Sequence, residues 1–251
     1  TITVGATPTP HAEILNAAKD ALKAEGYTLN VVEFTDYVQP NTALVDGDLD
    51  ANYFQHTPYL NNFNKENGTD LAAAFDMHYE PFGIYAGKTA SIEELKDGAS
   101  IAIPNDGSNE TRALLLLQDA GLIKLKDSAE FNPTIDDIET YNTKITIEEL
   151  KANVIPSTLA DVTAAVVNGN YALDFGLKTE DAIYKDDQLD IEEYWNLIAA
   201  RSADLEDADK LETYKKVVAA FQSDETEKVF NDQFGGYFIK AGWDQDLLAD
   251  K

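Results

Sequence analysis

The chain opens with a strand, a helix and a second strand, and this order restricts the fold more than any other feature. Residues 2–6 alternate as a strand does, residues 11–25 carry apolar side chains at helical spacing, and residues 29–34 are again strand-like. Two strands joined in this way favour a parallel sheet with a crossover helix. We therefore expect an α/β protein.

The rest of the chain suggests a second α/β block inserted into the first. An extended aromatic stretch, residues 75–86, is interrupted by Pro81 and Gly83 and would carry the chain out of the first lobe. A later apolar strand, residues 196–200, would carry it back. Between and beyond them we expect a strand at 144–147, a helix at 158–167, a strand at 171–175, and helices at 205–223 and 225–234. We predict two lobes, residues 1–83 plus 200–251 and residues 84–199.

A strand, a turn-rich loop and an apolar helix follow one another in residues 100–117. Ser108 or Asn109 can cap the helix, which places Arg112 in its first turn. A cation there opposes the helix dipole, while the free N–H groups of a helix start already attract anions. Arg112 would strengthen such a site and could hold a carboxylate through two hydrogen bonds.

The alternative for Arg112 is an ordinary surface arginine. An acidic protein offers it many partners, and Asp106 or Glu110 could pair with it locally. Local chemistry alone leaves both interpretations open.

An aromatic segment, residues 53–59, follows a predicted buried strand. Ligands of open α/β sheets bind at the carboxyl ends of strands. Phe54, His56 and Tyr59 could form an apolar box with a polar rim there. The alternative is that Tyr53 and Phe54 only pack in the core.

Three amides lie near predicted strand ends and lobe crossings: Asn168, Asn170 and Asn196. An asparagine can hydrogen-bond both an amine and a carboxylate. Turn formation is the alternative, above all for Asn168 before Gly169. An arginine, an aromatic box and amides together suit a small zwitterion with an apolar side chain.

Composition and motifs exclude several functions. The net charge of −27 argues against nucleic-acid binding, which depends on neutralising phosphates. There is no cysteine, and none of the three histidines lies at metal-ligand spacing from another histidine. Nucleotide-binding, metalloprotease and hydrolase motifs are absent from the sequence. We predict no catalytic residues, no metal and no cofactor.

Six segments, in order along almost the whole chain, carry a resemblance to a known family. They are FTDYVQPN (34–41), DANYFQHTPYL (50–60), PND (104–106) with RALLLLQ (112–118), GLIKL (121–125), AVVNGNYA (165–172) and NLIA (196–199). With these segments the chain resembles the substrate-binding lipoproteins of methionine ABC importers. The second and third segments are the most specific.

The resemblance implies a type II periplasmic-binding-protein fold with two crossovers and the ligand between the lobes. It implies binding of methionine, most often L-methionine, and delivery to an ABC permease and ATPase. Arg112 would bind the carboxylate, and Asn168 and Asn196 would hold the carboxylate and the amine, with Asn170 as a secondary candidate. The side-chain pocket would be lined by Tyr37, Phe54, His56 and Tyr59.

The resemblance also implies an extracytoplasmic, monomeric protein with a lipid anchor on an N-terminal cysteine. The sequence has no cysteine, so we expect it to be a truncated mature form. It departs from the family pattern at Thr57 and at Gly107-Ser108, which could alter ligand choice. The alternatives are another small apolar amino acid or a short peptide as ligand, an interaction protein, and an amino-acid-acting enzyme that uses His56 and Tyr59.

Overall fold

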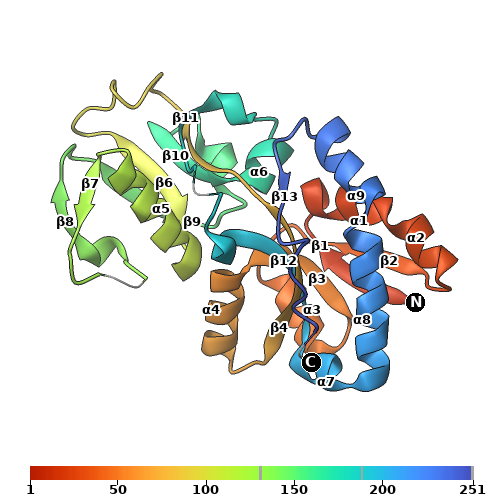
Figure 1. Ribbon diagram of the computed structural model, residues 1–251. Helices are drawn as coiled ribbons and strands as arrows, with labels where there is room; N and C mark the ends of the chain where they lie inside the picture. The colour runs from red at the N-terminus through yellow and green to blue at the C-terminus, as the bar shows by residue number, and fades with distance from the viewer. Residues whose placement is uncertain (130–131, 188, 250–251) are drawn as a thin grey trace. The chain divides into compact units, whose positions relative to one another are not determined.

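The chain folds into two compact units, each with its own sheet. The structure is a computed structural model that describes residues 1–129, 132–187 and 189–249. Unit 1 consists of Thr1–Glu80 and Leu189–Lys251, and unit 2 of Pro81–Gln188. The chain therefore passes from one unit to the other twice. Figure 1 labels most of the elements of both units.

Unit 1 contains a six-stranded sheet in the order β13-β4-β12-β3-β1-β2. Strand β1 pairs in parallel with both β2 and β3, whereas β12 is antiparallel to β3 and β4, and β13 is antiparallel to β4. The predicted β-α-β opening is thus confirmed. The strands are β1 (Ile2–Ala6), β2 (Leu29–Glu33), β3 (Ala51–His56), β4 (Leu71–Tyr79), β12 (Trp195–Arg201) and β13 (Ile239–Lys240).

The helices of unit 1 are short apart from α4 and α8. They are α1 (Glu13–Ala17), α2 (Lys19–Ala24), α3 (Gln39–Asp46), α4 (Thr57–Asn67), α7 (Ser202–Glu206), α8 (Ala208–Phe221) and α9 (Asp224–Lys228). One part of the core lies where α3 and α4 meet the sheet, with Leu44, Leu60, Phe63 and Leu197 in one cluster. Gly68 ends α4 with a φ of 63°, a left-handed conformation that glycine adopts without strain.

Unit 2 contains a five-stranded sheet in the order β11-β5-β10-β6-β9 and a small β7-β8 pair. Strand β10 is antiparallel to β5 and parallel to β6, so this sheet is also mixed. The strands are β5 (Phe82–Ala86), β6 (Ser100–Pro104), β7 (Ile123–Leu125), β8 (Ile138–Tyr141), β9 (Thr146–Leu150), β10 (Ala164–Asn168) and β11 (Ala182–Lys185).

Two helices, α5 (Gly107–Asp119) and α6 (Gly169–Asp174), follow strands of this sheet directly. Helix α5 buries Leu114 and Leu117 against Ile101 and Ile103 of β6 in the core of unit 2. The strand, loop and helix predicted around Arg112 are therefore present. Among the described residues, no helix is both long and apolar enough to cross a membrane.

The division into units differs from the predicted lobes at the second crossing. We predicted residues 84–199 as lobe II, but β12 pairs with β3 and β4 and so belongs to unit 1. The first crossing, at Glu80 and Pro81, lies close to the predicted boundary after residue 83.

The secondary structure around Asn168 is the reverse of the prediction. We expected a helix at 158–167 and a strand at 171–175, but residues 164–168 form β10 and residues 169–174 form α6. All five residues of β10 are buried, so its sequence shows no alternation that would mark it as a strand. Asn168 consequently ends a strand and precedes a helix.

Candidate functional site

Helix α5 places Arg112 in its second turn rather than its first. The helix begins at Gly107, and Asp106 caps it by accepting a hydrogen bond from the backbone N–H of Asn109 at 3.0 Å. The Asp106 carboxylate also accepts from the Asn109 side-chain amide. The anion site predicted at this helix start is therefore filled by the chain's own carboxylate.

Arg112 is buried and ion-paired with Asp186, which follows β11. The Arg112 Nε and Nη2 both donate to Asp186 Oδ2, at 3.2 and 3.0 Å. The guanidinium also lies over the Phe82 ring, 4.4 Å from its centroid. Arg112 is only 4% exposed, so it is not an ordinary surface arginine.

Asn168 carries a buried acceptor that the described part of the chain leaves unpaired. Its Nδ2 donates to Asn109 Oδ1 at 3.2 Å, but its own Oδ1 has no hydrogen-bond partner. A buried carbonyl oxygen without a donor costs roughly 1–3 kcal/mol. Asn109 and Arg112 are three residues apart on α5 and share one helix face. Unit 2 thus presents a buried cation and an unpaired acceptor from neighbouring elements.

The backbone next to Asn168 is tightly packed. A Cβ atom on Gly169 would lie 2.5 Å from the Pro81 carbonyl oxygen, so only glycine fits there. Asn170 follows in α6 and is buried, at 1% exposed. Glycine at this position therefore lets two asparagines flank a close approach of the backbone to Pro81.

Three predicted pocket residues of unit 1 are in mutual ring contact. Tyr37, Phe54 and Tyr59 have centroid separations of 5.7 Å for Tyr37–Phe54, 5.8 Å for Tyr37–Tyr59 and 5.7 Å for Phe54–Tyr59. The Tyr59 hydroxyl donates to the Tyr37 carbonyl at 2.7 Å and fixes the pair. We call these three residues the aromatic cluster.

His56 has a structural role that its sequence context did not reveal. It is the N-cap of α4, and its Nδ1 accepts from the backbone N–H of Tyr59 at 3.2 Å. Its ring also packs edge-on against Tyr194, with centroids 5.6 Å apart. His56 therefore sets the start of the helix that carries Tyr59.

Asn196 lies in β12, where the sheet register places it opposite His56 of β3 and His78 of β4. It is buried, and its Oδ1 is 2.8 Å from His11 Nε2. Sequence reasoning singled out Asn196 but not its partner, because His11 lies far away in the sequence.

His11 belongs to a buried polar network that sequence reasoning missed. Glu80 Oε1 is 3.0 Å from His11 Nε2 and 3.1 Å from His78 Nε2. His11 Nδ1 contacts the Thr7 hydroxyl at 2.6 Å, and His78 Nδ1 contacts the Tyr53 hydroxyl. The sheet register around β4 brings these residues together, and nothing in their sequence spacing signals it.

Burial and the histidines act in opposite directions on Glu80. Burial raises the pKa of Glu80, but the charges and hydrogen bonds of His11 and His78 outweigh this and lower the pKa to about 2. Burial lowers the pKa of His78 to about 4, against the effect of Glu80, and raises the pKa of Tyr53. At neutral pH the network therefore holds a carboxylate, a neutral His78 and a protonated tyrosine.

The same cluster has the composition of a metal site. One ligand atom each from His11, His78 and Glu80 lies within 4.8 Å of the others. The Nε2–Oε1 separations are hydrogen-bond distances, however, and both Nδ1 atoms have hydroxyl partners. In this structure the three groups are therefore paired through hydrogen bonds.

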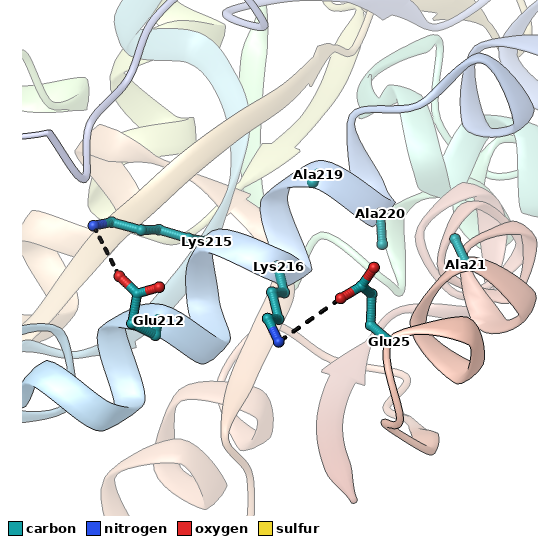
Figure 2. A pocket seen from close by; sticks show the side chains of 7 residues that line it. All are labelled: Ala21, Glu25, Glu212, Lys215, Lys216, Ala219 and Ala220. Atoms are coloured by element: carbon teal, nitrogen blue, oxygen red, sulfur yellow. Dashed lines mark hydrogen bonds and ion pairs between the residues drawn. The ribbon is translucent and has the colours of Figure 1, made fainter.

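A separate pocket of about 330 Å³ lies on unit 1 between α2 and α8. Figure 2 shows two ion pairs at its rim, Lys216–Glu25 and Lys215–Glu212, with Ala21, Ala219 and Ala220 along it. None of the predicted site residues lines this pocket. Exposed ion pairs of this kind contribute little to stability.

Comparison with known proteins gives concordant matches. Residues 2–242 match the family model described as NlpA lipoprotein. The D-methionine-binding lipoprotein MetQ of Escherichia coli is 42% identical over 230 residues, which cover 90% of this chain and 82% of that protein. A nutrient binding protein from Burkholderia cenocepacia, solved bound to methionine, is 43% identical with a TM-score of 0.90, over 96% of this chain and 100% of that one.

A third match is the substrate-binding protein of a methionine transporter from Streptococcus pneumoniae. It is 35% identical with a TM-score of 0.89, over 96% of this chain and 95% of that one. The two mixed α/β units and these matches define an extracytoplasmic binding protein rather than an enzyme. The chain belongs to the NlpA lipoprotein family, a family of membrane lipoproteins.

Proposed function

We propose that this protein binds methionine outside the cytoplasm and delivers it to the permease and ATPase of an ABC importer. The family membership and the names of the relatives support the ligand class. The chain passes twice between two α/β units, which is the connectivity of a type II periplasmic-binding-protein architecture. An N-terminal lipid anchor is part of the proposal.

The observation that carries the proposal is the presence in unit 2 of both a buried guanidinium, that of Arg112, and a buried acceptor without a donor, Asn168 Oδ1. An amino acid brings one carboxylate and one ammonium group. The guanidinium of Arg112 can donate to the carboxylate, and Asn168 Oδ1 can accept from the ammonium. A ligand with both groups would satisfy a buried atom that is otherwise without a donor.

The remaining predicted residues complete the proposed site. The aromatic cluster would contact the thioether side chain, since sulfur packs favourably against aromatic rings. Asn196 would contact the polar end of the ligand, and Asn170 lies beside Asn168. His56 would contribute a ring edge as well as its cap.

The test is calorimetry on protein unfolded, washed free of small molecules and refolded. We expect saturable binding of L-methionine or D-methionine, weaker binding of alanine, and weaker binding of 4-(methylthio)butanoate, which lacks the ammonium group. Absence of binding to either methionine enantiomer would overturn the proposal. Tighter binding of leucine or a short peptide than of methionine would show that the proposed ligand is wrong and would identify another in its place.

Delivery is tested separately in vesicles that contain the cognate permease and ATPase. We expect methionine uptake to require this protein and to be lost with a variant that does not bind methionine.

A further inference from the structure

We infer that His11 and Glu80 are positioning residues that fix the orientation of the Asn196 side chain, so that its amide presents N–H donors to the ligand carboxylate. This inference rests on the proposed function. It concerns a polar network that lies behind Asn196 and has no assigned role.

The first step is the protonation of the network. Glu80 is a carboxylate at neutral pH and can only accept hydrogen bonds. Both histidines approach it through Nε2, at 3.0 and 3.1 Å, so each Nε2 carries a hydrogen atom. The hydroxyls of Thr7 and Tyr53 are the partners of the two Nδ1 atoms and hold the rings in place.

The second step is the orientation of Asn196. The His11 Nε2–H faces both Glu80 and Asn196, and a donor on His11 requires the oxygen of the amide, Oδ1, at 2.8 Å. The Nδ2 group of Asn196 must then point away from His11. If His11 instead presented a lone pair, the amide would turn over, but that lone pair would face the Glu80 carboxylate.

The third step is the consequence for binding. With Oδ1 held against His11, Asn196 presents its Nδ2 donors on the opposite side, and these suit a carboxylate better than an ammonium group. Asn168 has the opposite pattern, because its Nδ2 is bound and its Oδ1 is unpaired. The two amides therefore receive different roles from their own hydrogen bonds.

The network also lies where a rigid support is needed. Glu80 is the last residue of unit 1 before the first crossing, and Asn196 follows the second crossing in the adjacent strand β12. The side chains of His11, His78 and Glu80 are buried, at 0%, 0% and 7% exposed. Buried, fully paired networks of this kind hold a single arrangement.

The experiment measures binding of three ligands to His11→Leu, His11→Gln and Glu80→Gln. The ligands are methionine, 4-(methylthio)butanoate and methioninol, which keeps the ammonium group but lacks the carboxylate. We expect His11→Leu to lose about tenfold or more in affinity for the two carboxylates and clearly less for methioninol. The His11→Gln variant, whose amide can still donate to Asn196, should recover part of the loss.

Glu80→Gln keeps the shape of the side chain. It therefore tests the inference even if the His11 variants do not fold. Tyr214→Phe is the matched control, because it removes one partly buried hydrogen bond of unit 1, to the Asp50 carbonyl at 2.6 Å, away from the network. It should lower the melting temperature and leave all three affinities in the wild-type order.

Equal losses for all three ligands in His11→Leu and Glu80→Gln would overturn the inference, because a purely structural role lowers binding without regard to the carboxylate. So would unchanged methionine affinity. Failure of the proposed function has a different signature, since the wild-type protein itself would then not bind methionine.

Discussion

One carboxylate oxygen of Asp186, Oδ2, accepts hydrogen bonds from both Nε and Nη2 of the Arg112 guanidinium. Both side chains are 5% exposed. Removal of one member of a buried pair leaves the other charge uncompensated, at a cost of about 3–5 kcal/mol. Asp186 therefore neutralises the arginine before any ligand binds.

The first prediction concerns Asp186→Asn, which keeps the side-chain shape. The ligand-free variant should melt at a lower temperature than the wild type. A bound carboxylate then compensates Arg112, so the methionine-induced rise in melting temperature should be larger than in the wild type. Glu139→Gln, which breaks an exposed pair with Lys124, is the control and should change neither value. An equal or smaller rise would contradict the prediction.

A second prediction concerns Arg112 itself. Arg112→Ala should reduce methionine affinity about 100-fold or more, because a charge-assisted contact to the carboxylate is lost. Arg112→Lys should keep the ion pair with Asp186 but lose the two parallel donors of the guanidinium. Its methionine affinity should therefore lie between those of the wild type and Arg112→Ala. Calorimetry well below the melting temperature separates binding from unfolding. Wild-type affinity in Arg112→Ala would show that the residue is only structural.

A third prediction separates the two roles of His56. His56→Ala should destabilise the protein by about 1 kcal/mol through loss of the α4 cap, whereas His56→Asn restores a capping side chain without the ring. If the ring contacts the ligand, both variants should weaken methionine binding more than alanine binding. Denaturant titration and calorimetry together test this. Full recovery of binding in His56→Asn would restrict His56 to its capping role.

A fourth prediction applies the same ligand series to the aromatic cluster. Tyr59→Ala should weaken methionine and norleucine more than alanine, because the longer side chains lose an aromatic surface. Tyr59→Phe, which loses the hydrogen bond to the Tyr37 carbonyl but keeps the ring, should have a smaller effect. A uniform loss across the series would count against a side-chain pocket at this cluster.

The fifth prediction concerns pH. The pKa of His78 is lowered by burial from 6.5 to about 4, so the unfolded chain binds a proton that the folded protein does not between these values. The contribution of His78 to the free energy of unfolding should therefore decrease as the pH falls from 6.5 towards 4. His78→Gln removes this contribution. Urea titrations at pH 7 and pH 4.5 should show that the free energy of unfolding changes less with pH in the variant than in the wild type. An identical change in both proteins would refute the assignment.

The α/β class could be predicted from the sequence because the opening β-α-β pattern is local and strongly periodic. It failed around Asn168, where a fully buried strand of small and β-branched residues lacks the period that separates strands from helices. The Asn168-Gly169 pair was interpreted as a helix end, whereas it joins a strand to a helix. Its position next to a tight backbone contact with Pro81 depends on tertiary packing.

The partners of the predicted residues could not be found from sequence. Asp186 is one of 46 acidic residues, and no local pattern distinguishes it. The contact between His11 and Asn196 requires β12 to lie between β3 and β4, and this strand order depends on the packing of the whole sheet. Arg112, Phe54 and Tyr59 were singled out as candidates because they lie in the two most specific segments, whereas Asp186 and His11 lie in none of the six segments.

Strand β12 has a consequence for the order in which the protein can be made. It lies between β3 and β4, so the sheet of unit 1 has a gap at its centre until residues 195–201 leave the ribosome. The sheet of unit 2 needs only residues 82–185 and can close earlier. During synthesis the first 80 residues must wait with β3 unpaired along one edge and β4 unpaired along both, and unpaired strand edges are prone to aggregation.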